Sequence, residues 1–372
     1  MYRYHTPSGD KSMDGLAMAL RLGLPLRDME MVQFHPTGLL AGPDTRMTGT
    51  VLEEGLRGAG GHLLNGNGER FMLERDPRAE RATRDFVSRC IYEEMRAGRT
   101  STHGGVYIKM GHLGPDQVAK QFKGMVERCA DCGFDLAGGL VEVVPTAHYH
   151  MGGVICEVDT ATELAGLFVA GEDAGGAHGA NRLGGNGVAN STVFGGIAGE
   201  TMANWIMRNR GHRLPDEAVL RFELARAQYP FAHRSGNLNQ LRERLLAIMW
   251  DDVGVIRDAA GLQRGMTKLE ELEQELLASG LSDGDRAFNL TWQDWLNLRS
   301  LVEVSQAIVS AALKRQNSRG AHFRQDFPAE GDLASSTFTV VRQHGGGLDI
   351  AAQAVQFTIV RPGESLIREA AR

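Results

Sequence analysis

The chain has 372 residues, 42% of them hydrophobic and 23% charged, which is long enough for two or more domains and too apolar for a wholly disordered protein. Its formal net charge of -6 excludes the broadly basic surface that drives non-specific nucleic-acid binding, and no run of eighteen apolar residues marks a membrane-spanning helix. Four cysteines do not make a disulfide scaffold, and the first residues lack the apolar core of a secretory signal, so we expect a cytoplasmic protein.

Glycine is the outlier in the composition. It contributes 47 residues, against about 7% in ordinary chains, and 34 of them lie in residues 1–210. All four tryptophans lie between Trp205 and Trp295. This contrast predicts glycine-rich strands and loops up to about residue 210 and a helical part after it.

Two segments place a histidine at the end of an apolar run, close to a proline. Residues 31–38 read Met-Val-Gln-Phe-His-Pro-Thr-Gly, and the proline after His35 favours an extended, turn-like chain. Residues 141–153 repeat this design around His148. Taken singly, each histidine is expected to be structural. Their repetition, 113 residues apart, favours a shared site.

Charged residues between these two segments form a second group of candidates. Glu54 and Arg57 lie three residues apart, so a helical turn would bring them onto one face as a pair. An ordinary surface ion pair of little energetic value is the alternative. Residues 81–89 indicate a helix start with Thr83 as its cap. Arg84 in that turn is either a functional cation or the solvated charge that such runs usually carry.

A single CxxC, Cys129 to Cys132, follows a helical run over residues 115–128. No second cysteine pair completes a zinc site, so we interpret these cysteines as structural and predict no metal site.

The most informative segment begins with an apolar run at residues 166–172, which predicts a buried parallel strand. A glycine-rich loop at 173–187 follows, and residues 188–207 are small and apolar enough for a buried helix. A strand, a glycine loop and a helix together offer backbone N–H groups and a helix dipole to an anionic or electron-rich ligand. A tight turn that binds nothing is the alternative.

Glu172, His178 and Arg182 lie in or next to this loop and favour a ligand. The GxGxxG fingerprint of dinucleotide-binding loops is absent, because the pairs Gly58/Gly60 and Gly185/Gly187 lack the third glycine. A dinucleotide site therefore cannot be assigned from that motif.

The C-terminal part has helical periodicity. Apolar residues recur at three- and four-residue steps over 241–256, 262–276 and 292–313, which predicts a helix bundle from about 213 to 317. Residues 337–342 and 355–360 resemble strands, with Gly345-Gly346-Gly347 in the connection between them.

Six motifs in this order resemble the flavoprotein subunit of succinate dehydrogenase and fumarate reductase, a family that has L-aspartate oxidase as a close relative. The likeness runs from about residue 4 to residue 328. The motifs are Gln33–Gly38, Glu54–Gly58, Gly68–Met72, Arg84-Asp85, His148–Gly153 and His178–Asn186.

The resemblance implies an α/β plus α fold, in which a partial FAD-binding, Rossmann-like domain is interrupted by an α+β capping domain and followed by a helical bundle. On this sequence the flavin-binding domain would comprise residues 1–34 and 149–209, and the cap residues 35–148. The helical domain would comprise residues 210–328, followed by a strand-rich tail at 329–372.

The resemblance also implies residue roles. Hydride would move between the substrate carbon and flavin N5, and Arg84 would transfer the proton with Glu54 and Arg57 as its relay. The dicarboxylate would be held by His35, Glu53, His148 and Arg182. FAD would contact Asp14, Glu172, Asn186, Gly187 and Val188.

Three departures from the family pattern bear on these expectations. Glu53 stands where a substrate-binding threonine is common, and residues 8–15 are a variant of the usual Thr-Gly-Asp-Gly run. The family's upstream segment, which holds the GxGxxG loop and in some members a flavin-linked histidine, is not among these residues. An L-aspartate oxidase and a silent binding module without flavin are therefore the alternatives to a succinate–fumarate oxidoreductase.

The loop at 182–186 looks more like the dehydrogenase version than the oxidase version. The family further implies partners, namely an iron–sulfur subunit together with membrane-anchor subunits, and a peripheral position on the cytoplasmic face of the inner membrane.

Overall fold

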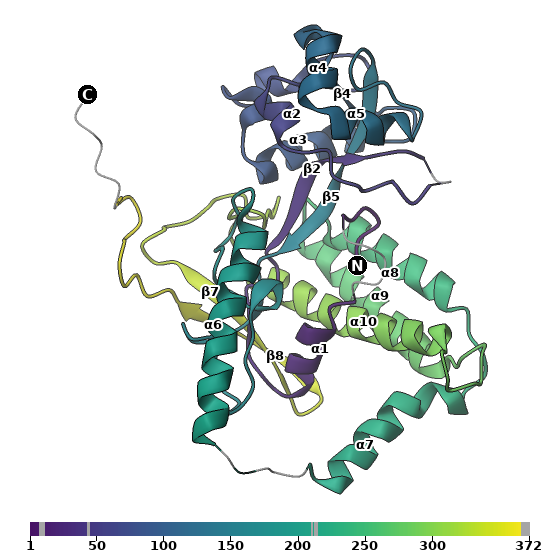
Figure 1. Ribbon diagram of the computed structural model, residues 1–372, viewed down its shortest axis with the longest axis vertical. Coiled ribbons are helices and arrows are strands. Elements are labelled where there is room, and N and C mark those ends of the chain that lie inside the picture. The colour runs from purple at the N-terminus through teal and green to yellow at the C-terminus, as the bar shows by residue number, and fades with distance from the viewer. Residues whose placement is uncertain (7–11, 43–44, 210, 212–214, 366–372) are drawn as a thin grey trace.

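The computed structural model describes residues 1–6, 12–42, 45–209, 211 and 215–365, which form two four-stranded sheets and a set of long helices (Figure 1). Among these residues, no helix combines the length and the apolar character needed to cross a lipid bilayer.

The first sheet belongs to the unit at the top of Figure 1. Its antiparallel strands lie in the order β2 (Val32–Leu39), β5 (Leu140–His150), β4 (Val106–Lys109) and β3 (His62–Leu64). Its α-helices are α2 (Gly55–Gly58), α3 (Arg84–Arg96), α4 (Pro115–Gln121) and α5 (Lys123–Ala130). Short 3₁₀ helices span Phe71–Glu74, Ala79–Arg81 and Gly111–Leu113. Apolar side chains of strands and helices share one core, as an α+β unit requires.

Pro36 lies within β2 and distorts it. Proline cannot donate a hydrogen bond to a sheet ladder, and the β2–β5 register shifts between His35 and Gly38. The backbone N–H of Thr37 instead donates to Nδ1 of His35 at 3.3 Å. A neutral His35 ring in this arrangement carries its proton on Nε2. The proline that follows His35 in the sequence therefore helps to set the ring's orientation and tautomer.

The second sheet has the strand order β6 (Gly153–Val154), β1 (Leu26–Arg27), β7 (Thr337–His344) and β8 (Gly347–Ala354). The predicted strand at 337–342 is confirmed by β7. The predicted strand at 355–360 is wrong, because the chain turns at Gly345 and Gly346 and pairs at once as β8. Both glycines have positive φ angles, as a two-residue type I′ hairpin turn requires. The turn sets the register, and an alanine-rich strand has no clear periodicity of its own.

The predicted helix bundle is confirmed for the described residues. It consists of α7 (Glu217–Gln228), the 3₁₀ helix Tyr229–Ala232, α8 (Leu238–Val253), α9 (Ala259–Ala278) and α10 (Leu290–Lys314). The side chains of Asn237, Asp258 and Asn289 cap α8, α9 and α10. Leucines and tryptophans of these three helices pack against α1 (Asp14–Arg21) in one large core.

The predicted buried strand at 166–172 is wrong. An isolated bridge joins Phe168 to Ala161, and the 3₁₀ helix Gly171–Asp173 ends the segment. A buried parallel strand needs ladder partners, and no strand of the described chain pairs with this segment. The helix after it is confirmed as α6 (Asn186–Arg208), but its predicted burial is wrong.

Only Asn190 and Ala198 of α6 are buried, whereas Val188 is 77% exposed and Met207 is 62% exposed. Composition indicated a helix, but burial depends on which other element covers it. Within the described residues, the main neighbour of α6 is the short 3₁₀ helix Gly171–Asp173.

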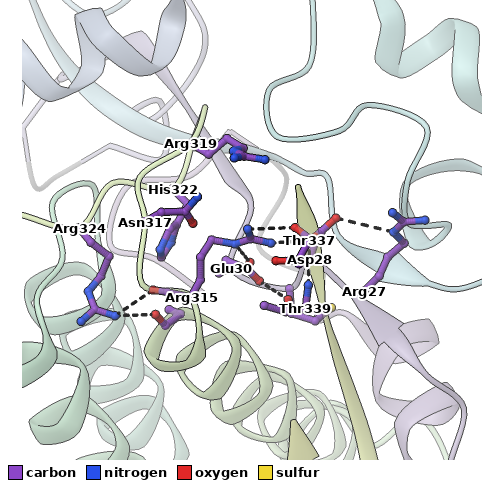
Figure 2. A network of polar contacts seen from close by, with 12 residues as sticks. Arg27, Asp28, Glu30, Arg315, Asn317, Arg319, His322, Arg324, Thr337 and Thr339 are labelled. Atoms are coloured by element: carbon purple, nitrogen blue, oxygen red, sulfur yellow. Dashed lines mark hydrogen bonds and ion pairs between the residues drawn. The ribbon is translucent and has the colours of Figure 1, made fainter. Parts of the chain in front are cut away.

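A buried ion network joins the second sheet to the end of α10 (Figure 2). Arg315, directly after α10, pairs with Asp28 at 2.9 Å and with Glu30, and it donates to the carbonyl oxygen of Thr337. The hydroxyl group of Thr339 donates to Glu30 at 2.7 Å. The network links three parts of the sequence that lie about 300 residues apart at their extremes.

Candidate functional site

The first turn of α3 carries Arg84 toward β2 and α2. Thr83 occupies the predicted N-cap position, although its side chain does not form a capping bond. The Arg84 guanidinium donates to Oε2 of Glu54 from Nη2 at 2.7 Å and from Nε at 3.1 Å, and Nη1 donates to Gln33 Oε1 at 3.3 Å. Its side chain is only 10% exposed, so Arg84 is not the solvated surface charge of the alternative interpretation.

Glu54 connects Arg84 to Arg57. Its other oxygen, Oε1, accepts from Arg57 Nη2 at 3.1 Å. Burial acts to raise the pKa of Glu54, but the hydrogen bonds and charges of Arg84 and Arg57 outweigh burial and lower it. Burial lowers the pKa of Arg57, against the raising effect of Glu54. The carboxylate thus stands between two guanidiniums with one oxygen facing each, which is the arrangement a proton relay needs.

The rings of His35 and His148 meet edge to face. The ring centroids of His35 and His148 are 5.3 Å apart, and His148 Nδ1 lies 3.0 Å from the Thr6 hydroxyl group. Burial lowers the pKa of His35 well below its ordinary value. Basic neighbours lower it further, namely Arg84, His148, Arg57 and Arg182. His35 is therefore a neutral hydrogen-bond donor surrounded by basic side chains.

Arg182 approaches the same place from the glycine-rich loop. Its guanidinium lies 4.6 Å from the ring centroid of Tyr149, and Nη1 donates to the carbonyl oxygen of Leu183 at 3.2 Å. The residue is 6% exposed, and its buried Nε has no hydrogen-bond partner among the residues that the structure describes. Burial lowers the pKa of Arg182, and the charge of Arg84 lowers it further.

The backbone of this loop touches the cap. A Cβ atom built on Gly184 would lie 2.8 Å from Glu54 Oε2 and 3.1 Å from Arg84 Nη2, so only glycine fits there without a shift. The structure thus brings together Arg84, Glu54, Arg57, His35, His148 and Arg182 from five segments of the chain. Glu53 is exposed, and within the described residues no hydrogen bond joins it to this cluster.

The residues predicted to contact flavin lie on adjoining elements. Glu172 Oε1 accepts from the backbone N–H of His150 at 3.0 Å. Asn186, Gly187 and Val188 form the first turn of α6. Asp14 begins α1, is exposed, and accepts a hydrogen bond from Ser12. Of the variant run at 8–15, residues 7–11 lie outside the described residues.

These elements offer backbone N–H groups and polar side chains to an electron-rich cofactor. A small cavity of about 60 Å³ is lined by Glu172, His148 and Tyr149 together with residues of the N-terminus and of α10. A Cβ atom on Gly187 would lie 3.0 Å from the Tyr149 ring, so the α6 backbone approaches closely. Gly185 precedes α6 with a φ of 81°, and α6 has no side-chain cap, so N–H groups of its first turn can face a ligand.

Sequence reasoning missed the roles of Gln33, Asp85, Tyr149 and Asn181. Gln33 is fully buried, and its amide nitrogen donates to Asn181 and to the carbonyl oxygen of Arg182. Asn190 and His178 both contact the Tyr149 hydroxyl group. A polar glutamine inside an apolar run, two residues before His35, is the signal that identifies Gln33.

Two family models match the chain. The FAD binding domain model matches residues 4–188, and the model of the fumarate reductase flavoprotein C-terminal region matches residues 242–366. The first match identifies FAD as the cofactor.

Individual proteins agree with these models. A fumarate reductase (CoM/CoB) subunit of Methanothermobacter marburgensis is 39% identical over 86% of this chain and 57% of its own length. L-Aspartate oxidase of Yersinia pestis is 34% identical over 88% of this chain and 58% of its own length. The chain thus spans less than two thirds of the curated relatives it matches.

A solved structure of a mutant of E. coli quinol fumarate reductase superposes with a TM-score of 0.87 at 31% identity, covering 98% of this chain and 65% of that one. This likeness confirms the predicted fold class. From the models, the relatives and the superposition together, the chain belongs to the family of succinate dehydrogenase and fumarate reductase flavoproteins, whose members are FAD-dependent oxidoreductases.

Proposed function

We propose that this chain carries the dicarboxylate-binding and proton-transferring part of a FAD-dependent oxidoreductase that interconverts succinate and fumarate. The observation that carries the proposal is the placement of Arg84, held by Glu54 against Arg57, beside His35 and Arg182. Bound FAD would supply the ring that accepts or donates hydride. The other roles belong to side chains of this chain.

The substrate carboxylates would be held by Arg182, His35 and His148. Arg182 suits a carboxylate because its guanidinium presents a planar set of donors and its buried Nε has no partner within the described structure. His35 would donate from Nε2 as a neutral ring, so it binds by hydrogen bonding and not by charge. These groups orient the two central carbons of a four-carbon diacid toward Arg84 and the ring.

Arg84 would give a proton to one carbon as hydride reaches the other, and take it back in the reverse direction. An arginine releases a proton reluctantly, and after giving one up it needs a neighbour that passes a proton back to it quickly. Glu54, ionised between turnovers because its pKa is lowered, touches Arg84 and Arg57 at once and can pass a proton from one to the other.

The test is Arg84→Ala in the full-length flavoprotein. We expect succinate oxidation and fumarate reduction to fall by about 10²- to 10⁴-fold, the usual contribution of a general acid–base group, while calorimetry still detects dicarboxylate binding. Arg96→Ala, an exposed arginine on the same helix, is the matched control and should keep its activity. Turnover close to wild type in Arg84→Ala would refute the role.

L-Aspartate oxidation is the second candidate, supported by the likeness to the Yersinia enzyme. Comparing succinate with L-aspartate as reductant separates the two activities. Glu53→Thr, which restores the residue common in the family, should change the ratio of the two rates if Glu53 contributes to substrate choice. A colourless chain that takes up no added FAD would instead favour a silent binding module.

We also propose partner subunits, because relatives of this chain are named as subunits of larger enzymes. An iron–sulfur subunit would receive the electrons, and anchor subunits would hold the assembly at the cytoplasmic face of the inner membrane. Purification through a tag on this chain, followed by iron analysis, tests this. We retain the boundaries 35–148 for the cap and 1–34 with 149–209 for the flavin-binding domain as part of the proposal.

A further inference from the structure

A hydrogen-bond chain crosses from the cap to the glycine-rich loop beside the candidate site. The Asn181 side-chain nitrogen donates to Asp85 Oδ1 at 2.8 Å, and its side-chain oxygen accepts from Gln33 Nε2 at 2.9 Å. Both ends of one carboxamide are therefore in use. Asp85 is held in turn by Arg89, one helical turn further along α3, at 3.6 Å.

The sequence positions of Asp85 and Asn181 explain why this series of hydrogen bonds matters for the site. Asp85 directly follows Arg84, and Asn181 directly precedes Arg182. The bond between them therefore ties together the backbone segments that carry Arg84 and Arg182. Gln33 adds a second tie, because it accepts from Arg84 and donates to the carbonyl oxygen of Arg182.

These ties act against a repulsion. Arg84 and Arg182 lie close enough for each positive charge to disfavour the other, and both charges act on the neutral ring of His35. Without a bound dianion, like charges push the cap and the loop apart. Glu54 offsets part of this charge from the cap side, and Glu172 offsets part of the charge of Arg182. The hydrogen bond between Asp85 and Asn181 restrains the separation of Arg84 from Arg182. It does not occupy the place where a substrate carboxylate would bind.

We propose that Asp85 and Asn181 are positioning residues. Their hydrogen bond, called the clasp below, holds the cap against the glycine-rich loop and sets the spacing between Arg84 and Arg182. This inference rests on the proposed function and concerns how the same site is assembled. Neither residue touches the reacting atoms. Loss of the clasp is expected to weaken dicarboxylate binding, because the bound substrate must then also close and order the cap.

The decisive experiment is a reciprocal exchange in the full-length flavoprotein. Asn181→Asp places two carboxylates face to face and should raise KM for succinate and the Kd for malonate by about 10- to 100-fold, as expected for a lost hydrogen bond to a charged group. Asp85→Asn together with Asn181→Asp restores a donor and an acceptor in reversed positions. The double variant should return to within about threefold of wild type.

The controls separate the clasp from folding and from the proposed function. Asp131→Asn, an exposed aspartate of the cap, should behave as wild type. If Asn181→Asp does not fold, as judged by its thermal transition, the double variant alone still tests rescue.

A wild-type flavoprotein that binds no dicarboxylate would refute the proposed function. If wild type binds dicarboxylate, either of two results would overturn the clasp alone. One is that Asn181→Asp binds dicarboxylate as tightly as wild type. The other is that the double variant binds it no more tightly than Asn181→Asp.

Discussion

Arg315 is a position where a single substitution should cost much stability. Its side chain is 4% exposed and is paired with Asp28, 11% exposed, and with Glu30, fully buried. Replacing it by methionine keeps most of the side-chain volume but leaves two carboxylates without their shared guanidinium (Figure 2). Removing one partner of a buried ion pair typically costs about 3–5 kcal/mol, and here one partner serves two carboxylates.

We therefore expect Arg315→Met to lower the free energy of unfolding by about 4 kcal/mol at pH 7.5, a large fraction of the usual 5–15 kcal/mol. Urea unfolding followed by tryptophan fluorescence measures this, because Trp250 and Trp295 lie in the core of the bundle that Arg315 ends.

The loss should depend on pH. Burial and the neighbouring Glu30 raise the pKa of Asp28 to about 6 even with Arg315 present. Without that guanidinium the pKa rises further, so protonation at pH 5 removes one of the stranded charges. The loss at pH 5 should be clearly smaller than at pH 7.5.

The control is Arg244→Met, which removes an exposed pair with Glu275 and should cost less than about 1 kcal/mol. A loss below 1 kcal/mol for Arg315→Met at pH 7.5, or one that does not change with pH, would show that the two carboxylates do not depend on Arg315.

Three further predictions concern other parts of the molecule. Because the folded-state pKa of Asp28 is raised, its contribution to stability is fully present below about pH 4 and is lost as the pH rises through 6. Over that range the free energy of unfolding of wild type should therefore fall by up to about 3 kcal/mol relative to that of Asp28→Asn. Parallel stability curves for the two proteins would contradict this. Burial raises the pKa of Cys129 to about 12, so iodoacetamide at pH 8 should label it only after unfolding, and prompt labelling of the native chain would be the contrary result. Gly187→Ala should displace Tyr149 and reduce flavin absorbance and dicarboxylate affinity, whereas Gly195→Ala, on the same helix but with open space at its Cβ, should change neither; equal behaviour of the two variants would refute the close approach.

Local pattern was sufficient for some elements and insufficient for others. Helices α8, α9 and α10 have apolar residues at three- and four-residue steps, and each begins at a capping side chain, so periodicity and capping agree. Strand β8 lacks such a signal, and its place depends on the two-residue turn before it. Helix α6 was recognised as a helix, but its exposed apolar residues could not be foreseen, since burial is a property of neighbouring elements.

The candidate site shows the same division. Motifs at His35, Glu54, Arg84 and Arg182 could be read from the chain, and their roles came from the resemblance to a known family. The pairing of Glu54 with Arg57 followed from their spacing, but that Glu54 also binds Arg84, and that Gln33 and Asn181 join the cap to the loop, could not be read in this way. These contacts link residues between 30 and 149 positions apart.

The sequence by itself determined which segments are helical, where several helices begin, and which residue types were available for carboxylate binding and proton transfer. Hydrogen bonding and capping within a few residues are sufficient for these features. Only the tertiary structure decided which cations converge. The β2–β5 pairing joins segments more than a hundred residues apart in the chain, and it brings the cap's charged residues next to the glycine-rich loop before α6. It also decided that His35 is neutral and Arg84 is shielded, since both follow from how much water and how many charges the surrounding elements leave near them.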